Sequence, residues 1–258
     1  MRPVLHEYTL AKGVRVFSTT REGGVSEGKY ASFNVNAYCG DTTAHVVTNK
    51  KALATCLGVE AGDIIMPHQV HGKRSVVVDE DFIRNPERER HDLLEGADVI
   101  MTRLKGVCVG VSTADCVPVL LYDAEKGVVC AVHAGWRGTV IRVVQEAVSD
   151  MNKRYGTLAS DLRAVIGPCI SLDSFEVGDE VYDRFCQAGF NMSLIAREYE
   201  KWHIDLPECN RLQLMEVGVN PLNIQSAHVC TYMNSSRFFS ARKLGIDSGR
   251  IFSGILLR

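Results

Sequence analysis

Two reactive side chains stand where apolar strands are expected to give way to turns. Cys116 lies in the segment Ser112-Thr113-Ala114-Asp115-Cys116-Val117-Pro118, and His133 opens the segment His133-Ala134-Gly135-Trp136-Arg137-Gly138. They are 17 residues apart (133 minus 116) on what the hydrophobic pattern predicts to be neighbouring strands. A thiol and an imidazole in this arrangement act either as a Cys–His catalytic pair or as two ligands of one metal ion.

A third candidate, His71, precedes a glycine in the segment Met66-Pro67-His68-Gln69-Val70-His71-Gly72, just before an expected strand at Ser75. Binding and catalytic residues are commonly held at such boundaries by a rigid scaffold. Two imidazoles and one thiolate form a zinc site of the catalytic kind, in which the fourth position is left for water. The alternative is that His68 or His71 only caps a loop.

Two arginines near turns offer sites for an anion. Arg137 lies just before a helix expected to begin near Thr139, so it would share the positive end of that helix. Arg21 precedes Gly23-Gly24-Val25-Ser26-Glu27-Gly28-Lys29, which has the spacing of a nucleotide-binding phosphate loop. Tyr30 stands where such a loop needs a Ser or Thr hydroxyl, so an ATPase is not favoured. The segment is either a plain glycine turn or one where Arg21 binds an oxyanion.

Composition limits the classes of protein that these residues can serve. The chain has 258 residues, of which 46% are hydrophobic and 23% charged, as in ordinary folded proteins. Lys and Arg total 29 against 31 Asp and Glu, a net charge of -2, so small-molecule or anionic partners are favoured over nucleic acid. No segment approaches the ~20 apolar residues of a membrane span, and we expect no secretory leader. Nine scattered cysteines without a CxxC pair predict free thiols in a reducing cytoplasm.

Short apolar runs separated by turn residues predict the strands that carry these side chains. The runs at 107–112, 117–122 and 127–132 are almost continuously hydrophobic, so they should be buried on both faces. Further strands are expected at 14–20, 75–78, 97–101, 163–166, 224–229 and 250–256. Helices are expected from Thr139 to about Gly156, at 178–186 and at 207–217. The charged stretch 79–92 is expected to be a solvated loop. These elements favour one α/β domain over residues 1–258, with mixed sheets and helices outside them.

Eight motifs, in order along nearly the whole chain, resemble those of the YfiH/YlmD family, formerly labelled multicopper polyphenol oxidases. They are Thr19–Ser26, Ser32–Asn34, Gln69–Gly72, Thr113–Cys116, His133–Gly138, Ile166–Ile170, Phe175–Val177, and Cys230-Thr231 with Phe239–Arg242. The resemblance implies a single α/β/β/α domain, similar to a bacterial toxin with a Cys–His deamidase site. It also implies a zinc site made of the histidine of QVHG, the cysteine of TADC and the histidine of HAGWRG, which are His71, Cys116 and His133 here.

The same resemblance implies purine nucleoside chemistry, namely phosphorolysis of adenosine, inosine, guanosine and methylthioadenosine, with adenosine deamination at the same site. Zinc would lower the pKa of bound water for deamination, whereas phosphorolysis needs an anion pocket beside the sugar. The residues implied for these roles, besides the three ligands, are Asp115 as an orienting group or base, Arg21, Arg137 and Arg242 for phosphate, and Asn34 and Glu176 for the substrate. The chain lacks the family's Leu-Gly step after Asn34 and has Ala241 at a frequent tyrosine position, so the pocket's shape should differ.

Two other enzyme classes fit part of this pattern. A blue copper centre takes two histidines and a cysteine, but a laccase also needs many more imidazoles, usually in closely spaced H-x-H pairs. The chain has 8 histidines and no H-x-H pair, so a copper polyphenol oxidase ranks below nucleoside chemistry. A metal-free Cys–His hydrolase or amidase, acting for example on a peptidoglycan precursor, would use Cys116 as nucleophile and His133 as base.

Overall fold

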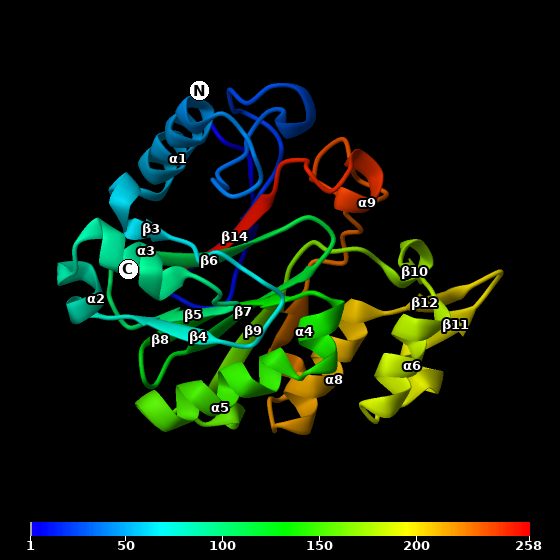
Figure 1. Ribbon diagram of the computed structural model, residues 1–258. Helices are drawn as coiled ribbons and strands as arrows, with labels where there is room; N and C mark the ends of the chain where they lie inside the picture. Colours follow the sequence, from blue (N-terminus) through cyan, green and yellow to red (C-terminus); the bar gives the residue numbers. More distant parts are fainter. Residues whose placement is uncertain (1) are drawn as a thin grey trace.

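Two mixed β-sheets, stacked face to face with helices on their outer sides, form the centre of the molecule (Figure 1). The computed structural model describes residues 2–258. One sheet has five strands in the order β1 (Leu5–Tyr8), β2 (Val14–Thr19), β14 (Ile251–Leu257), β6 (Cys108–Thr113) and β3 (Ile64–Ile65). Its neighbours are antiparallel except β3, which runs parallel to β6.

The second sheet carries most of the site. Its six strands have the order β13 (Ile224–Ser226), β9 (Leu162–Ile166), β7 (Val117–Asp123), β8 (Val128–Ala134), β5 (Val99–Thr102) and β4 (Ser75–Val78). The two edge pairs, β13 with β9 and β4 with β5, are parallel, and the four central strands are antiparallel to one another. β7 and β8 therefore form a hairpin at the middle of the sheet.

The core between the sheets consists of aliphatic side chains from both inner faces. Val109 and Val111 of β6 meet Leu120 of β7 and Ala131 of β8, and all four are fully buried. Every residue of β6, β7 and β8 is buried, which confirms the burial expected from their continuous hydrophobic sequence. Sheets pack this way about 10 Å apart, with interdigitated side chains, so the strand ends above them are held rigidly.

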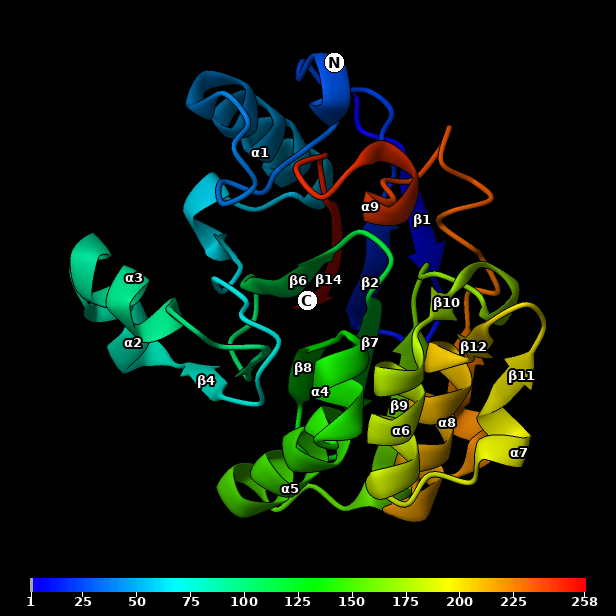
Figure 2. The same ribbon diagram turned by 45° about the vertical axis from the view of Figure 1, so that its right-hand side comes forward.

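Helices cover the outer face of each sheet, which completes the α/β/β/α order of layers implied by the family resemblance. α1 (Thr43–Leu57) packs Leu53 against Phe17 and Phe252 of the five-stranded sheet. α5 (Val143–Tyr155) and α8 (Leu206–Glu216) cover the six-stranded sheet, where Val144 and Leu214 join its apolar face. Figure 2 shows α5 and α8 on the side of β7, β8 and β9 that faces away from β2 and β14.

The remaining elements surround this centre. A small antiparallel sheet of β10 (Glu176–Val177), β12 (Trp202–Ile204) and β11 (Ala196–Glu198) lies beside α6 (Asp179–Gln187) and α7 (Met192–Ile195). α4 (Trp136–Val140) follows β8 directly, and α9 (Ala241–Leu244) precedes β14. Single turns of 3-10 helix occur at Gly28–Tyr30, Ala61–Asp63, Ala159–Asp161, Leu172–Ser174 and Pro221–Asn223. Within residues 2–258, none of the helices combines the length and hydrophobicity needed to span a membrane.

The expectation of a solvated loop at 79–92 is wrong. This stretch forms α2 (Glu80–Arg84) and α3 (Glu87–Leu94). The Asp79 carboxylate accepts a hydrogen bond from the Phe82 N–H at 2.9 Å and so caps α2, and the Phe82 ring is buried against the core. Pro86 stands at the N-cap of α3, where a missing N–H costs nothing.

The helix expected from Thr139 is divided in two. α4 ends at Val140 and α5 begins at Val143, because Arg142 between them has φ 64, in the left-handed region. Gly156, also left-handed, ends α5 as expected. The other predicted strands and helices are present with ends shifted by a few residues, whereas α1 was not predicted.

Candidate metal centre and active site

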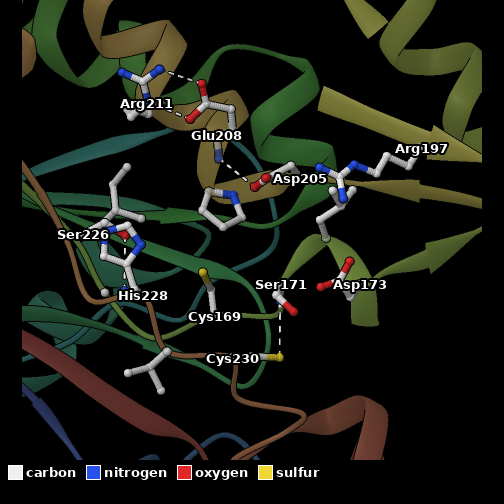
Figure 3. Close-up of a pocket in the computed structure, with 15 residues that line it drawn as sticks. Cys169, Ser171, Asp173, Arg197, Asp205, Glu208, Arg211, Ser226, His228 and Cys230 are labelled. Carbon is white, nitrogen blue, oxygen red and sulfur yellow. Dashed lines mark hydrogen bonds and ion pairs between the residues drawn. The ribbon is translucent and has the colours of Figure 1, made fainter. Parts of the chain in front are cut away.

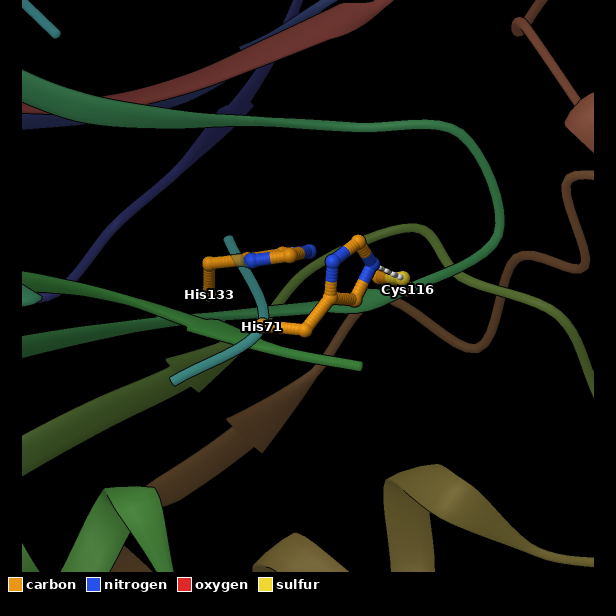
Figure 4. A group of neighbouring side chains, drawn as sticks. All are labelled: His71, Cys116 and His133. Carbon is orange, nitrogen blue, oxygen red and sulfur yellow. Dashed lines mark hydrogen bonds between the residues drawn. The ribbon is translucent and has the colours of Figure 1, made fainter. Parts of the chain in front are cut away.

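Three side chains from separate segments converge at one end of the six-stranded sheet: His71, Cys116 and His133 (Figure 4). One ring nitrogen or sulfur atom of each lies within 4.8 Å of the others, and Cys116 Sγ is 3.9 Å from His71 Nε2. Pro118 of β7 pairs with His133 of β8, so Cys116, two residues earlier on the same face, lies beside His133. His71 comes from the loop before β4. The structure thus brings together the three residues that the sequence singles out as candidate metal ligands.

The donor set of this group fits a metal ion. Two imidazoles and a thiolate are ligands of zinc and also of copper. In a tetrahedral zinc site, bonds of about 2.3 Å to sulfur and 2.0–2.1 Å to nitrogen leave those two ligand atoms roughly 3.5 Å apart. The 3.9 Å between Cys116 Sγ and His71 Nε2 is close to that value.

A buried carboxylate, Asp98, fixes the two histidines. Its Oδ1 accepts hydrogen bonds from His133 Nδ1 at 2.7 Å and from the His71 N–H at 3.0 Å, and its Oδ2 accepts from the Gly72 N–H at 2.7 Å. The Val70 N–H lies 3.3 Å from the same Oδ2. A carboxylate can only accept, so it holds a proton on His133 Nδ1 and turns Nε2 toward Cys116 and His71.

The charges in this group stabilise the form of Cys116 that binds metal. Burial would raise the pKa of the Cys116 thiol, but His133 and His71 outweigh it and lower the pKa to about 6. Burial would lower the pKa of His133, but Cys116 and Asp98 raise it to about 9. Burial also opposes ionisation of Asp98, and its hydrogen bonds, first that from His133, nevertheless lower its pKa. Cys116 is therefore held as a thiolate, the state of a cysteine that coordinates metals and attacks electrophiles.

The main chain is unusual at two positions of the site. His71 has φ 64 and Asp115 has φ 91, both in the region that favours glycine. Side chains held there cost about 1–3 kcal/mol each and persist only where their surroundings impose them. At His71 the bond from its N–H to Asp98 supplies that constraint. At Asp115 the constraint comes from the hydrogen bonds of its carboxylate.

Asp115, Glu176 and Arg242 belong to one network next to Cys116. The Asp115 carboxylate accepts from the Thr231 hydroxyl at 2.6 Å and from the Arg242 N–H at 2.7 Å. The Arg242 guanidinium in turn donates to the Glu176 carbonyl at 3.1 Å. Both oxygens of Asp115 are thus engaged away from the histidines, so the carboxylate that orients His133 is Asp98 rather than Asp115. A role for Asp115 as a base stays a prediction.

Arg21 and Asn34 join segments around the site. Arg21 Nε donates to the Ala31 carbonyl at 2.9 Å, and its guanidinium lies 4.9 Å from the centre of the Phe239 ring. Burial lowers the pKa of Arg21. Asn34 is fully buried, and its Oδ1 accepts from the Arg250 N–H at 3.1 Å. Their contacts with substrate or phosphate stay predictions.

The start of α4 lies against His71 and Cys116. A Cβ added at Gly135 would lie 2.7 Å from His71 Cδ2 and 3.0 Å from Cys116 Sγ, so the approach requires glycine. α4 begins at Trp136, earlier than expected from the sequence, which puts Arg137 in its first turn. The Arg137 side chain is exposed, with its guanidinium 4.3 Å from the centre of the Trp136 ring.

The three ligands line a cavity of about 190 Å³. Its wall includes Gln69, whose side-chain amide donates to the Ser112 carbonyl and accepts from the Ser112 N–H, both at 2.8 Å. The Tyr38 ring stacks on His68 at 4.4 Å between centroids at the same cavity. Thr113 also lines it, but the Thr113 hydroxyl is buried away from solvent and has no hydrogen-bond partner within the described residues 2–258. The cavity therefore offers an aromatic surface next to His71, Cys116 and His133.

Sequence reasoning missed Asp98 and Arg250. Asp98 was detectable as the only charge in the apolar segment Ala97–Met101, since a carboxylate there must be buried with partners. Arg250 lines the cavity, yet in sequence it stands merely at the start of a strand. Six predicted residues are not part of the cavity lining, although Ala241 beside Arg242 is: Arg21, Asn34, Asp115, Arg137, Glu176 and Arg242.

Comparisons with known proteins match most of this chain in sequence and in structure. Residues 15–258 match the family model described as multi-copper polyphenol oxidoreductase laccase. YlmD from Geobacillus stearothermophilus superposes with a TM-score of 0.89 at 32% identity, covering 96% of this chain and 93% of that one. YfiH from Bacillus licheniformis superposes with a TM-score of 0.88 at 31% identity, covering 95% and 93%. The chain belongs to the YfiH/YlmD family.

Several relatives of this chain in the YfiH/YlmD family are named as enzymes. A purine nucleoside phosphorylase of Bacteroides thetaiotaomicron is 45% identical over 244 residues, which are 93% of this chain and 90% of the relative. A protein named adenosine deaminase RL5, from an unknown prokaryotic organism, is 43% identical over 95% of this chain and 94% of its own length. The purine nucleoside phosphorylase YlmD of Bacillus subtilis is 34% identical over 92% and 86%.

Asp98→Asn should weaken metal binding about 10- to 100-fold, because an amide supplies one acceptor oxygen where the site needs two. Zinc affinity is measured by competition with a chromophoric chelator. Asp123→Asn is the matched control, since Asp123 is also fully buried and accepts main-chain hydrogen bonds from Glu125 and Lys126. A folded Asp98→Asn protein with parental zinc affinity would contradict the role given to this carboxylate.

Gly135→Ala should also reduce zinc affinity and turnover, because the new methyl group would displace His71 and Cys116. The overall fold should survive, since φ at Gly135 is -68 and suits alanine. Gly62→Ala is the control, because a Cβ there meets nothing within 4 Å. The two variants are compared by zinc titration and thermal unfolding, and equal zinc affinities would show that the close approach at Gly135 does not matter.

Proposed function

We propose that this protein is a zinc-dependent purine nucleoside phosphorylase that also deaminates adenosine. The observation that carries the proposal is the group of His71, Cys116 and His133, oriented by Asp98 and opening into a cavity beside an aromatic stack. The names of the Bacteroides thetaiotaomicron phosphorylase and of adenosine deaminase RL5 support it. Adenosine, inosine, guanosine and methylthioadenosine are the proposed substrates, together with phosphate, in the cytoplasm.

Zinc is the proposed metal because the group has three protein ligands and faces a cavity, as catalytic zinc sites do. A bound zinc ion would supply a Lewis acid without redox chemistry. Residues of the chain would orient the histidine and shape the cavity. Asp98 holds the His133 ring, and Gln69 fixes the main chain at Ser112. The Tyr38 ring offers a flat face of the kind on which a purine stacks.

Phosphate is proposed to bind beside the ligands with help from Arg242 and Arg137. Arg242 follows Ala241, which lines the cavity, and its main chain is held by Asp115. Arg137 lies two residues after Gly135, which touches two ligands. Arg21, whose donors join neighbouring segments, is the weaker phosphate candidate, and Asn34 and Glu176 are proposed to shape the substrate site from outside the cavity lining.

A second candidate function, a metal-free Cys–His hydrolase or amidase, is favoured by one observation. Such enzymes use a nucleophile, a base and an orienting carboxylate, and these roles would fall to Cys116, His133 and Asp98. A copper polyphenol oxidase is suggested by the description of the matching family model alone. Metal content and product identity separate these possibilities from the proposed function.

The products formed from adenosine and phosphate test the proposed function. We expect adenine with ribose 1-phosphate from phosphorolysis and inosine from deamination, each identified by liquid chromatography and mass spectrometry. Cys116→Ser should lose both activities and the zinc, because a hydroxyl is a poor zinc ligand, while its thermal unfolding stays near that of the parent. Turnover that persists after complete removal of metal by a chelator would instead support the hydrolase.

Replacing Arg242 or Arg137 with glutamine should impair phosphorolysis more than deamination, because only phosphorolysis needs the anion. A charge-assisted contact contributes about 1.5–3 kcal/mol, so the KM for phosphate should rise roughly one to two orders of magnitude. Arg154→Gln is the control, since Arg154 is exposed near the far end of α5. Equal losses of adenine and inosine formation would assign both arginines a structural role.

A further inference from the structure

A second cavity, of about 430 Å³, lies between β9, β13 and the start of α8 (Figure 3). His71, Cys116 and His133 are not part of its lining, so it is separate from the metal group. Two cysteines, Cys169 and Cys230, line it together. Neither has a role in the proposed catalytic chemistry.

The two cysteines are main-chain partners in one step of parallel pairing. Cys169 and Cys230 form an isolated parallel β-bridge, in which the Cys169 N–H donates to the Val229 carbonyl at 3.2 Å and the Thr231 N–H to the Cys169 carbonyl at 2.9 Å. Paired strands lie about 4.7–4.9 Å apart, which falls within the Cα separation that a disulfide accepts. Their side chains project to the same side, since both reach the same cavity.

The two thiols have unequal surroundings. Cys230 Sγ accepts a hydrogen bond from the Ser171 N–H at 3.4 Å and has the Ser174 hydroxyl at 3.5 Å (Figure 3 shows the bond to Ser171). Burial would raise the pKa of Cys230, but the hydrogen bonds with Ser171 and Ser174 lower it. Cys169 is buried, which raises its pKa well above the ordinary value. A partly exposed thiol that ionises readily, next to a protonated one, is the arrangement of a redox-sensing pair.

We propose that Cys169 and Cys230 form a reversible disulfide on exposure to hydrogen peroxide, and that this disulfide lowers turnover at the metal site. The Cys230 thiolate attacks one peroxide oxygen, the O–O bond breaks, and hydroxide leaves to give a sulfenic acid. The Cys169 sulfur then displaces the sulfenic hydroxyl, which takes the thiol proton and departs as water. Two thiols are oxidised as one peroxide is reduced, and a dithiol reductant reverses the step.

The residues after the two cysteines connect the pair to the metal ligands. The Ile170 N–H donates to the Asp115 carbonyl at 2.9 Å, and the Thr231 hydroxyl donates to the Asp115 carboxylate at 2.6 Å. Asp115 directly precedes Cys116 and has the left-handed φ of 91. A disulfide would tie together the two segments that hold Asp115, and through Asp115 it would act on the neighbouring Cys116.

Peptide mass spectrometry tests the disulfide independently of any activity. Trypsin releases residues 164–184, whose only cysteine is Cys169, and residues 212–237, whose only cysteine is Cys230. After hydrogen peroxide treatment of the metal-loaded protein, we expect these two peptides to be linked, with the loss of two hydrogens, and to separate on reduction. Cys169→Ala should instead leave a Cys230 sulfenic acid that dimedone traps. Cys186→Ser, which removes an exposed cysteine elsewhere, should link as the parent does.

The absence of the linked peptides while Cys116 or Cys186 is oxidised would overturn the proposed disulfide. Adenosine turnover tests the coupling and rests on the proposed function, whereas the linked peptides do not. We expect a roughly fivefold or larger fall in turnover that a dithiol reverses in the parent and in Cys186→Ser, but not in Cys230→Ser, which should keep its activity under the same treatment. Linked peptides with unchanged turnover would overturn the coupling.

Discussion

The Asp98 carboxylate is the group on which the geometry of the site depends. A carboxylate that is fully buried is costly unless donors surround it, and here the N–H groups of Val70, His71 and Gly72 and the ring of His133 meet that need. The Asp98 carbonyl also accepts from the His133 N–H at 2.8 Å. One residue just before β5 thereby sets the positions of two candidate metal ligands from different segments. Moving either histidine would leave a buried charge without its partner.

The stacked sheets hold Cys116, the third candidate ligand, in a fixed position. Cys116 has no carboxylate of its own, and its position follows from the β7–β8 pairing and from Asp115. The apolar core beneath these strands resists shear, so the strand ends above it stay in register. The left-handed conformations of His71 and Asp115 are the local cost of bringing a loop and a turn to the end of the same sheet.

Sequence patterns predicted the strands and helices that show a local hydrophobic pattern. They missed the elements and residue roles that depend on partners distant in the sequence. Continuous apolar runs located β6, β7 and β8 and so placed Cys116 beside His133. α1 was missed because its inner face includes the buried Asn49, whose amide bonds to Ser26 and to the Asn34 carbonyl, so the helix lacks a clean apolar stripe. The helices at 80–94 were missed because their charged sequence hides the single buried anchor, Phe82. The role of Asp98 became visible only in three dimensions, since its donors lie up to 35 residues away.

The metal centre is the central claim, and diffraction from crystals grown without chelator tests it most directly. Data collected above the zinc absorption edge should show an anomalous peak within bonding distance of His71 Nε2, Cys116 Sγ and His133 Nε2. The peak should be absent from data collected below the edge. A peak that persists below the zinc edge, as copper would give, or no peak with the Cys116 sulfur directed away from both histidines, would contradict it.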